Sequence, residues 1–230
     1  MKTKYFDERM KLADLIVVNH NLILLLPRFG MPLGFGDRTV RDVCGEHGVS
    51  ATLFLMICNV STFSDYSPST EQLAQTDMSM LVPYLRASHR YYMDNRIPHI
   101  GRHLSRVADS LPNRVGDVLR NFYNDYSQEI ATHFRCEEEE VFPYLEALRG
   151  GQPPVAGGMG RFAESHESIE DKLSDLMQIV YKYLPAGATT DEVFALVFDL
   201  LQLSSDLEKH TSVEEHVLMP YMAFLERSRQ

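Results

Sequence analysis

Apolar residues recur with a helical period along most of the second part of the chain. The period runs from about residue 80 to 111, resumes up to about residue 148, returns from 161 to 183 and runs again toward residue 227. The breaks between these runs are rich in Gly and Pro, which end helices. No β alternation of useful length occurs anywhere in the chain. We therefore predict an all-α protein whose main part is an antiparallel four-helix bundle.

A shorter helical unit precedes the bundle. Here Thr39 can cap a helix that runs through Glu46, and Gly48 can end that helix in a left-handed turn. Ser50 can cap the next helix, which runs through Val60. The unit should consist of short helices separated by turns.

The predicted domain boundaries follow from a polar segment at residues 64–79. This segment contains Pro68 and lacks a strong apolar period, which is typical of a linker. It separates a small N-terminal helical domain, residues 1–63, from the bundle, residues 80–230.

Five positions of the bundle recur with a constant offset of 77 residues. The first copy is the set His89, His133, Glu137, Pro143 and Tyr144. The second copy is the set His166, His210, Glu214, Pro220 and Tyr221. Five shared positions indicate a duplicated helical hairpin. The histidines and glutamates are typical metal ligands, whereas the Pro-Tyr pairs suggest shared architecture, because proline kinks or ends a helix.

The spacing inside each repeat places the histidines at one height in the bundle. Residue 111, in the first turn, is midway between His89 and His133, and residue 188, in the second, is midway between His166 and His210. About 22 residues on either side of a turn end about 33 Å from it on both helices. Each Glu follows its His by four residues and shares its helical face. A single such pair is usually solvated, but the repetition predicts one metal site with ligands His89, His133, Glu137, His166, His210 and Glu214.

The kind and number of donors suggest a reactive site. Four imidazoles and two carboxylates suit two iron or manganese ions, because each carboxylate can bridge both ions. Six such side chains supply about eight bonds, whereas two octahedral ions have about twelve positions. Even with an oxide or hydroxide bridge, roughly two positions stay open for water or a small ligand. We expect two non-haem iron ions as the cofactor, with manganese as the less expected alternative.

The composition mainly excludes functions. Against 22 Lys and Arg stand 32 Asp and Glu, a net charge of −10, which disfavours nucleic-acid binding. No run approaches the roughly 20 apolar residues that cross a bilayer, and the N-terminus lacks a signal-peptide pattern. Three cysteines without a Cys-x-x-Cys spacing do not form a disulfide framework. We expect a cytoplasmic protein without membrane or nucleic-acid partners, with Cys44 and Cys58 in the core and Cys136 off the ligand face.

Several other residues are weaker candidates for a role at the predicted metal site. Glu138 and Glu215 each follow a predicted ligand glutamate, a position from which either carboxylate can accept a hydrogen bond from a ligand imidazole. His99 and His103 have no repeat partner, and ordinary packing is the favoured interpretation over a channel or supporting role. Tyr126 could line the site, but core packing is again favoured.

The ligand motifs resemble a known family. His133-Phe-Arg-Cys-Glu137 and His210-Thr-Ser-Val-Glu214, with His89 and His166, are similar to the hemerythrin-like cation-binding domain. They resemble in particular its iron-sulfur cluster repair branch, which has four His and two bridging Glu. Oxygen-carrying hemerythrins instead use five His with one Glu and one Asp, partly through a His-x-x-x-His motif.

The N-terminal segment is similar to the same branch. Residues 29–31, 38–44 and 46–49 resemble its small N-terminal domain, so the resemblance covers almost the whole chain. One departure is clear: where those proteins usually carry adjacent cysteines before a glycine, this chain has Gly34-Phe35-Gly36. A function that needs this thiol pair does not carry over automatically.

The resemblance implies a cytoplasmic di-iron protein that helps restore iron-sulfur clusters damaged by oxidative or nitrosative stress. It would act by supplying iron or as an oxidoreductase that reacts with NO or peroxide. Its implied partners are NO, O2 or peroxide, and iron-sulfur proteins; a homodimer is compatible with the chain. One alternative is a module that binds or senses a small gas or iron without turnover, and another is a metal-free interaction bundle.

Overall fold

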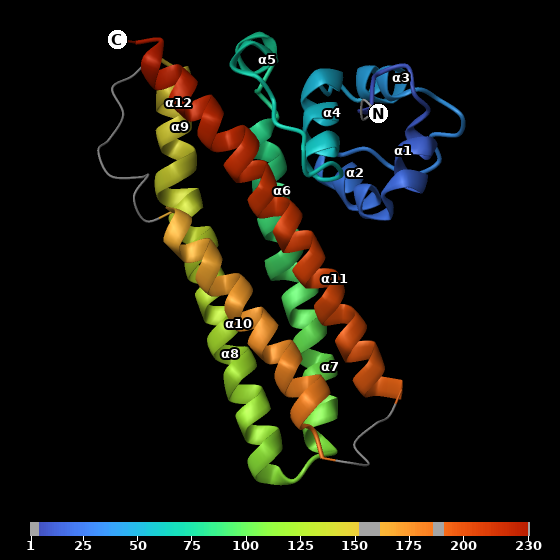
Figure 1. Ribbon diagram of the computed structural model, residues 1–230, viewed down its shortest axis with the longest axis vertical. Coiled ribbons are helices and arrows are strands. Elements are labelled where there is room, and N and C mark those ends of the chain that lie inside the picture. The colour runs from blue at the N-terminus through green and yellow to red at the C-terminus, as the bar shows by residue number, and fades with distance from the viewer. Residues whose placement is uncertain (1–4, 152–161, 186–190, 230) are drawn as a thin grey trace. The chain divides into compact units, whose positions relative to one another are not determined.

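The computed structural model describes residues 5–151, 162–185 and 191–229, without the side chains of residues 113 and 162–168 (Figure 1). Throughout these ranges the regular structure is helical, and the only β pairing is an isolated bridge between Lys11 and Thr39. The prediction of an all-α fold is confirmed. The chain divides into two compact units, Met1–Ser88 with Lys209–Gln230 and His89–Glu208.

The four predicted long helices are present, three of them as several consecutive segments. The first comprises α6 (Leu81–Tyr91), η2 (Tyr92–Arg96) and α7 (Ile97–Asp109), and the second comprises α8 (Asn113–Cys136), η3 (Glu137–Val141) and α9 (Phe142–Arg149). The third is α10 (Phe162–Tyr183), and the fourth comprises α11 (Asp191–Val213), η4 (Glu214–Leu218) and α12 (Met219–Arg227). The predicted hemerythrin-like bundle with a helical N-terminal region is confirmed.

The segments η2, η3 and η4 are single turns of π-helix, and each begins six residues before a proline. These prolines are Pro98, Pro143 and Pro220. A proline has no N–H, and its ring clashes with the carbonyl four residues earlier, which in each case lies inside the π turn. Widening the helix there accommodates the ring. Pro143 and Pro220 therefore do not end their helices, which continue as α9 and α12.

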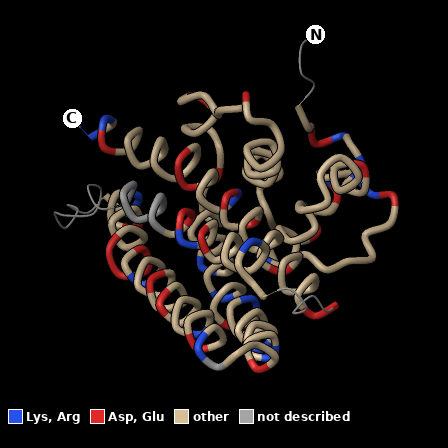
Figure 2. Tube along the Cα trace, turned by 60° about the horizontal axis from the view of Figure 1, so that its bottom comes forward, with Lys and Arg blue, Asp and Glu red and all other residues tan. Residues whose placement is uncertain are grey.

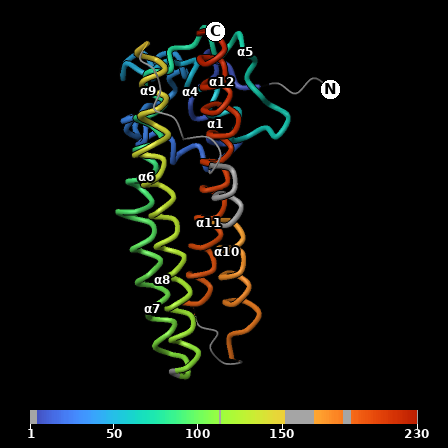
Figure 3. Tube along the Cα trace, turned by 90° about the vertical axis from the view of Figure 1, so that its left-hand side faces the viewer, coloured from blue at the N-terminus to red at the C-terminus, as the bar shows by residue number. Residues whose placement is uncertain are grey.

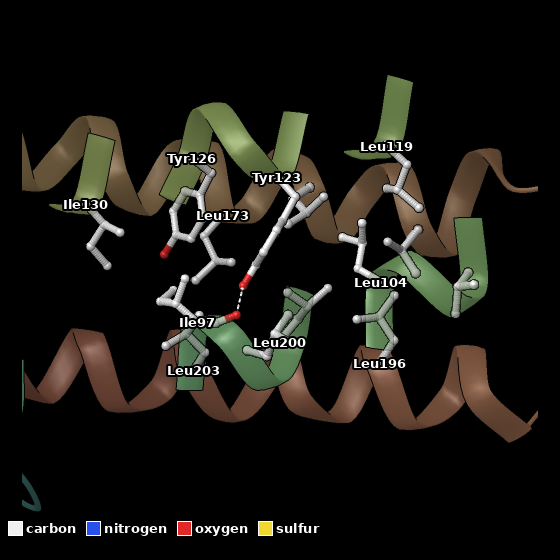
Figure 4. Close-up of a cluster of buried hydrophobic side chains, with 14 of the residues drawn as sticks. Ile97, Leu104, Leu119, Tyr123, Tyr126, Ile130, Leu173, Leu196, Leu200 and Leu203 are labelled. Carbon is white, nitrogen blue, oxygen red and sulfur yellow. Dashed lines mark hydrogen bonds between the residues drawn. The ribbon is translucent and has the colours of Figure 1, made fainter. Parts of the chain in front are cut away.

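In the unit His89–Glu208, the helices α7, α8, α10 and α11 run side by side, with successive helices in opposite directions (Figures 1 and 3). The helix α8 packs along both α7 and α10. Apolar side chains of all four helices meet in a continuous core, as at Leu104, Leu119, Leu173 and Leu200 (Figure 4). Each such buried leucine stabilises the fold by about 1.5–3 kcal/mol.

The other unit begins with short helices: α1 (Leu12–Val18), η1 (His20–Leu24), α2 (Leu25–Arg28), α3 (Val40–Glu46) and α4 (Ala51–Val60). The predicted caps are confirmed. Thr39 and Asp42 form a capping box at the start of α3, Gly48 follows its end with a φ of 66°, and Ser50 caps α4. Within this unit α4 packs against α3 and against η4.

The predicted linker at residues 64–79 contains one further helix, α5 (Thr70–Gln75), with its own capping box at Ser69. The helix α5 packs against α12. The domain boundaries at residues 63 and 79 stay a prediction.

The loop before α3 depends on glycine. Gly34 has a φ of 91° and Gly36 a φ of 61°, values that a residue with a side chain rarely adopts. A cysteine, like any other residue with a side chain, would therefore be strained at position 34 of this loop.

Charged residues are spread over the helices (Figure 2). Among the helices in the described part of the chain, none combines the length with the apolar character needed to span a bilayer.

Candidate metal centre

The repeated ligand residues occupy equivalent places in their helices. His133 lies in the last turn of α8 and Glu137 is the first residue of η3, while His210 lies in the last turn of α11 and Glu214 is the first residue of η4. Each repeated glutamate thus opens a π turn. The backbone of His166 belongs to α10, but its side chain lies outside the described residues.

Three predicted ligands meet in the unit His89–Glu208. The Nε2 atom of His89 lies 3.0 Å from Oε2 of Glu137, and Nε2 of His133 lies 3.0 Å from its Oε1. Only 4% of His89, 8% of His133 and 1% of Glu137 is exposed. Each oxygen of this buried carboxylate therefore faces one imidazole nitrogen.

Further contacts orient the His89 imidazole. Its Nδ1 atom lies 3.1 Å from Oε1 of Glu138, a hydrogen-bonding distance. The ring also stacks on Phe134 and Phe142, with centroid distances of 4.2 and 5.5 Å. A carboxylate that holds the second nitrogen of a ligand imidazole is the usual outer support of a metal site. The predicted contact of Glu138 with an imidazole of the predicted ligand set is thus confirmed, whereas Glu215 is exposed.

The aromatic neighbours were not predicted from the sequence. At the 77-residue offset, Thr211 and Met219 stand where the first half has Phe134 and Phe142. The repeat therefore carried no signal for this support.

The same His-Glu contact recurs in the second repeat. Nε2 of His210 lies 3.0 Å from Oε1 of Glu214, and the two residues are 2% and 0% exposed. Nearby His216 instead contacts the backbone oxygen of Ser212 through Nδ1, at 3.0 Å.

Four of the predicted ligands form one buried group. His89, Glu137, His210 and Glu214 each offer one ligand atom, and these atoms all lie within 4.8 Å of one another. His133 contacts this group through Glu137. The six-residue ligand set stays a prediction, because the side chain of His166 is not described.

The chemistry of this group fits a metal centre. Imidazole nitrogens and carboxylate oxygens are the donors that iron and manganese accept in proteins. Burying two carboxylates is costly unless positive charge compensates them. Metal cations held among Glu137, Glu214 and the histidines would supply that charge.

A cavity of about 630 Å³ adjoins His133. It is lined by residues of α8 and η3, including Cys136, and by Ile169 of α10. The cavity is large enough for a small molecule, and of the predicted ligands with described side chains only His133 lines it.

The structure confirms the predicted core position of some remaining residues and corrects the prediction for two histidines. Cys44 and Cys58 are core residues as predicted, and burial raises the pKa of the Cys44 thiol to about 12 and that of Cys58 well above its ordinary value. Tyr126 belongs to the core, also as predicted. The interpretation of His99 and His103 as ordinary packing residues is incomplete, because both imidazoles contact the carboxylate of Asp199.

Comparison with known proteins identifies the family. No curated protein matches the chain. The family model of the hemerythrin HHE cation-binding domain matches residues 80–222, which include all six predicted ligands. This match covers more than half of the chain, and such domains bind metal, usually iron. The chain therefore belongs to the hemerythrin family of HHE cation-binding domains.

Proposed function

We propose that this protein holds two non-haem iron ions and acts in the repair of iron-sulfur clusters or in the response to nitrosative and oxidative stress. The observation that carries the proposal is the buried group of His89, Glu137, His210 and Glu214. The proposed ligands also include His133 and His166. Six side chains and one oxide or hydroxide bridge would leave roughly two positions open on two octahedral ions.

The protein side chains would have distinct roles in this centre. Bound iron supplies redox chemistry and exchangeable coordination positions. Glu138, Phe134 and Phe142 hold the His89 ring with Nε2 toward Glu137. The near-complete burial of Glu137 and Glu214 limits access of bulk water. The cavity beside His133 would admit NO, O2 or peroxide.

A second candidate function is a module that binds or senses a small gas or iron without turnover. The observation that favours it is the Gly34-Phe35-Gly36 loop, whose backbone disfavours a cysteine at position 34. Thiolates are the ligands of iron-sulfur clusters, so a chain without the adjacent cysteines lacks a thiolate site for transferring iron to a cluster protein.

For both candidate functions we propose that the protein is located in the cytoplasm and assembles as a homodimer.

Metal analysis tests the shared premise. Protein purified without added iron and then reconstituted anaerobically should contain about two irons per chain. The double variant Glu137→Ala/Glu214→Ala is the matched control and should contain far less. Absence of iron under every reducing condition would reject both candidate functions and leave a metal-free interaction bundle.

Reactivity separates the two candidates. The reconstituted protein is mixed with NO, O2 or peroxide while optical spectra are recorded, and separately with an apo iron-sulfur protein. Supplied with an electron donor, a repair or stress-response protein should consume NO or peroxide over many equivalents, or else it should lose iron to the apo protein. A sensor should bind one small ligand reversibly, with no net chemistry and no iron loss.

A further inference from the structure

A second group of metal-ligating side chains lies in the unit His89–Glu208. His99 and His103 are one helical turn apart on α7, and Asp199 lies on α11. Nε2 of His99 is 3.2 Å from Oδ2 of Asp199, and Nδ1 of His103 is 2.8 Å from the same oxygen. None of the three residues belongs to the 77-residue repeat or to the HHE ligand set.

The distances suit the donors around a single ion. Zinc-class ions bind imidazole nitrogen and carboxylate oxygen at about 2.1 Å, so neighbouring donors lie about 3.0 Å apart in an octahedron and about 3.4 Å apart in a tetrahedron. The 3.2 Å contact of His99 with Asp199 lies between these two values, and the 2.8 Å contact of His103 is slightly shorter than the octahedral one. One ligand atom from each of the three residues also falls within the common 4.8 Å limit.

Arg96 fixes the carboxylate in the orientation that such a site needs. Its guanidinium donates to the backbone oxygen of Asp199 at 3.2 Å and to Oδ1 at 3.3 Å. Oδ2 is then directed to the imidazoles. The guanidinium charge also lowers the attraction of a cation to Asp199, so the site should bind more weakly than an unopposed carboxylate would.

The group is accessible from solvent. The side chains of His99, His103 and Asp199 are 42%, 22% and 18% exposed, respectively. The buried group of His89, Glu137, His210 and Glu214 is far less exposed. An ion held by these three side chains would keep its other coordination positions for water or an incoming ligand.

We propose that His99, His103 and Asp199 form a second, exchangeable site for one divalent transition-metal ion of the zinc, iron or copper class. Two imidazoles and one carboxylate are the donors that such ions accept. Magnesium and calcium prefer sets built of oxygen, and this group supplies a single carboxylate. The site is independent of the proposed di-iron function, because it shares no residue with that centre.

Zinc uptake by the reconstituted full chain tests the proposal. Equilibrium dialysis against Zn²⁺ in the presence of millimolar Mg²⁺ is followed by measurement of zinc and iron in the same samples. We expect His103→Gln and Asp199→Asn to bind about one zinc ion fewer per chain than the wild type, with unchanged iron. His47→Gln, at a histidine on the end of α3, is the matched control and should bind as much zinc as the wild type.

Optical titration with Co²⁺ provides a readout that a folding defect would not mimic. The wild type should develop visible bands of cobalt bound to nitrogen, and apparent affinity should fall at least tenfold in His99→Gln and His103→Gln. Far-UV circular dichroism verifies that the variants remain helical. Equal zinc and cobalt uptake by wild type and folded His103→Gln protein would overturn the proposal, and so would loss of all uptake on addition of Mg²⁺.

Discussion

Nδ1 of His89 lies 3.1 Å from Oε1 of Glu138, while Nε2 of the same ring lies 3.0 Å from Oε2 of Glu137. Two adjacent carboxylates thus hold the two nitrogens of one imidazole. Glu138 sets the tautomer and the angle of the ring, whereas Glu137 belongs to the buried group of His89, Glu137, His210 and Glu214. This relationship distinguishes a supporting residue from a proposed ligand.

Replacement of the supporting carboxylate should weaken metal binding without abolishing it. We expect Glu138→Gln to lower iron affinity about 10- to 100-fold, because loss of an outer hydrogen bond leaves the imidazole less basic and less fixed. Competition with a calibrated iron chelator measures the change. Glu215→Gln is the control, since Glu215 holds the repeat-equivalent place but is exposed. Equal affinities for the two variants would contradict this role of Glu138.

Replacement of a proposed bridging ligand should affect the metal-free and the iron-loaded protein differently. Glu214 is fully buried beside His210, so Glu214→Gln should leave the stability of the metal-free protein unchanged or raise it. The same change should lower the iron content and remove most of the stabilisation that iron provides. For the wild type this stabilisation amounts to about 2.7 kcal/mol when free iron is at a hundred times its Kd. Thermal melts with and without iron test this. An unaltered iron-induced shift would remove Glu214 from the ligand set.

Two buried tyrosines of the bundle core should respond in opposite ways to loss of the hydroxyl (Figure 4). The Tyr123 hydroxyl donates a 2.6 Å hydrogen bond to the backbone oxygen of Ile97, so Tyr123→Phe should destabilise the fold by about 1 kcal/mol. The buried hydroxyl of Tyr126 has no hydrogen-bond partner within the described residues, so Tyr126→Phe should be neutral or stabilising. Urea unfolding of both variants is the measurement. Equal losses would show that the Tyr123 hydrogen bond is not the cause.

The three thiols should differ in reactivity. Burial raises the pKa of Cys44 to about 12 and that of Cys58 well above its ordinary value, so at pH 8 only about one Cys44 thiol in ten thousand is ionised. Cys136 is partly exposed and lines the cavity beside His133. Iodoacetamide should therefore modify Cys136 alone in the native protein and all three cysteines after unfolding. Mass spectrometry of tryptic peptides identifies the sites, and early modification of Cys44 would be inconsistent with its burial.

The capping box of α3 should make a pH-dependent contribution to stability. The Asp42 carboxylate accepts hydrogen bonds from the Thr39 hydroxyl and backbone N–H, and these bonds hold its pKa below the ordinary value. A lowered folded-state pKa means that the stabilisation is complete above the unfolded-state pKa and is lost as pH falls through the folded-state pKa. The stability difference between wild type and Asp42→Asn should thus shrink from pH 7 to about pH 3. Urea unfolding across this range tests it, and a constant difference would exclude ionisation of Asp42 as the cause.

Much of the local structure could be predicted from the sequence because neighbouring residues encode it. Helical periodicity and the Gly- and Pro-rich breaks located the long helices, and Thr39, Gly48 and Ser50 marked the ends of α3 and α4. The 77-residue repeat likewise singled out His89, Glu137, His210 and Glu214, which lie together in the structure. The π turns were not predicted, because whether a helix ends, kinks or widens before a proline depends on what packs around it.

Only the tertiary structure decided how side chains on different helices meet. Glu138 and Glu215 occupy the same place in the repeat, yet one contacts His89 and the other is exposed. Asp199 meets His99 and His103 although about a hundred residues separate them, and no local pattern linked them. Sequence spacing determines which residues share a face of one helix. The rotation and register of packed helices determine which faces meet, and they result from the fit of the whole core.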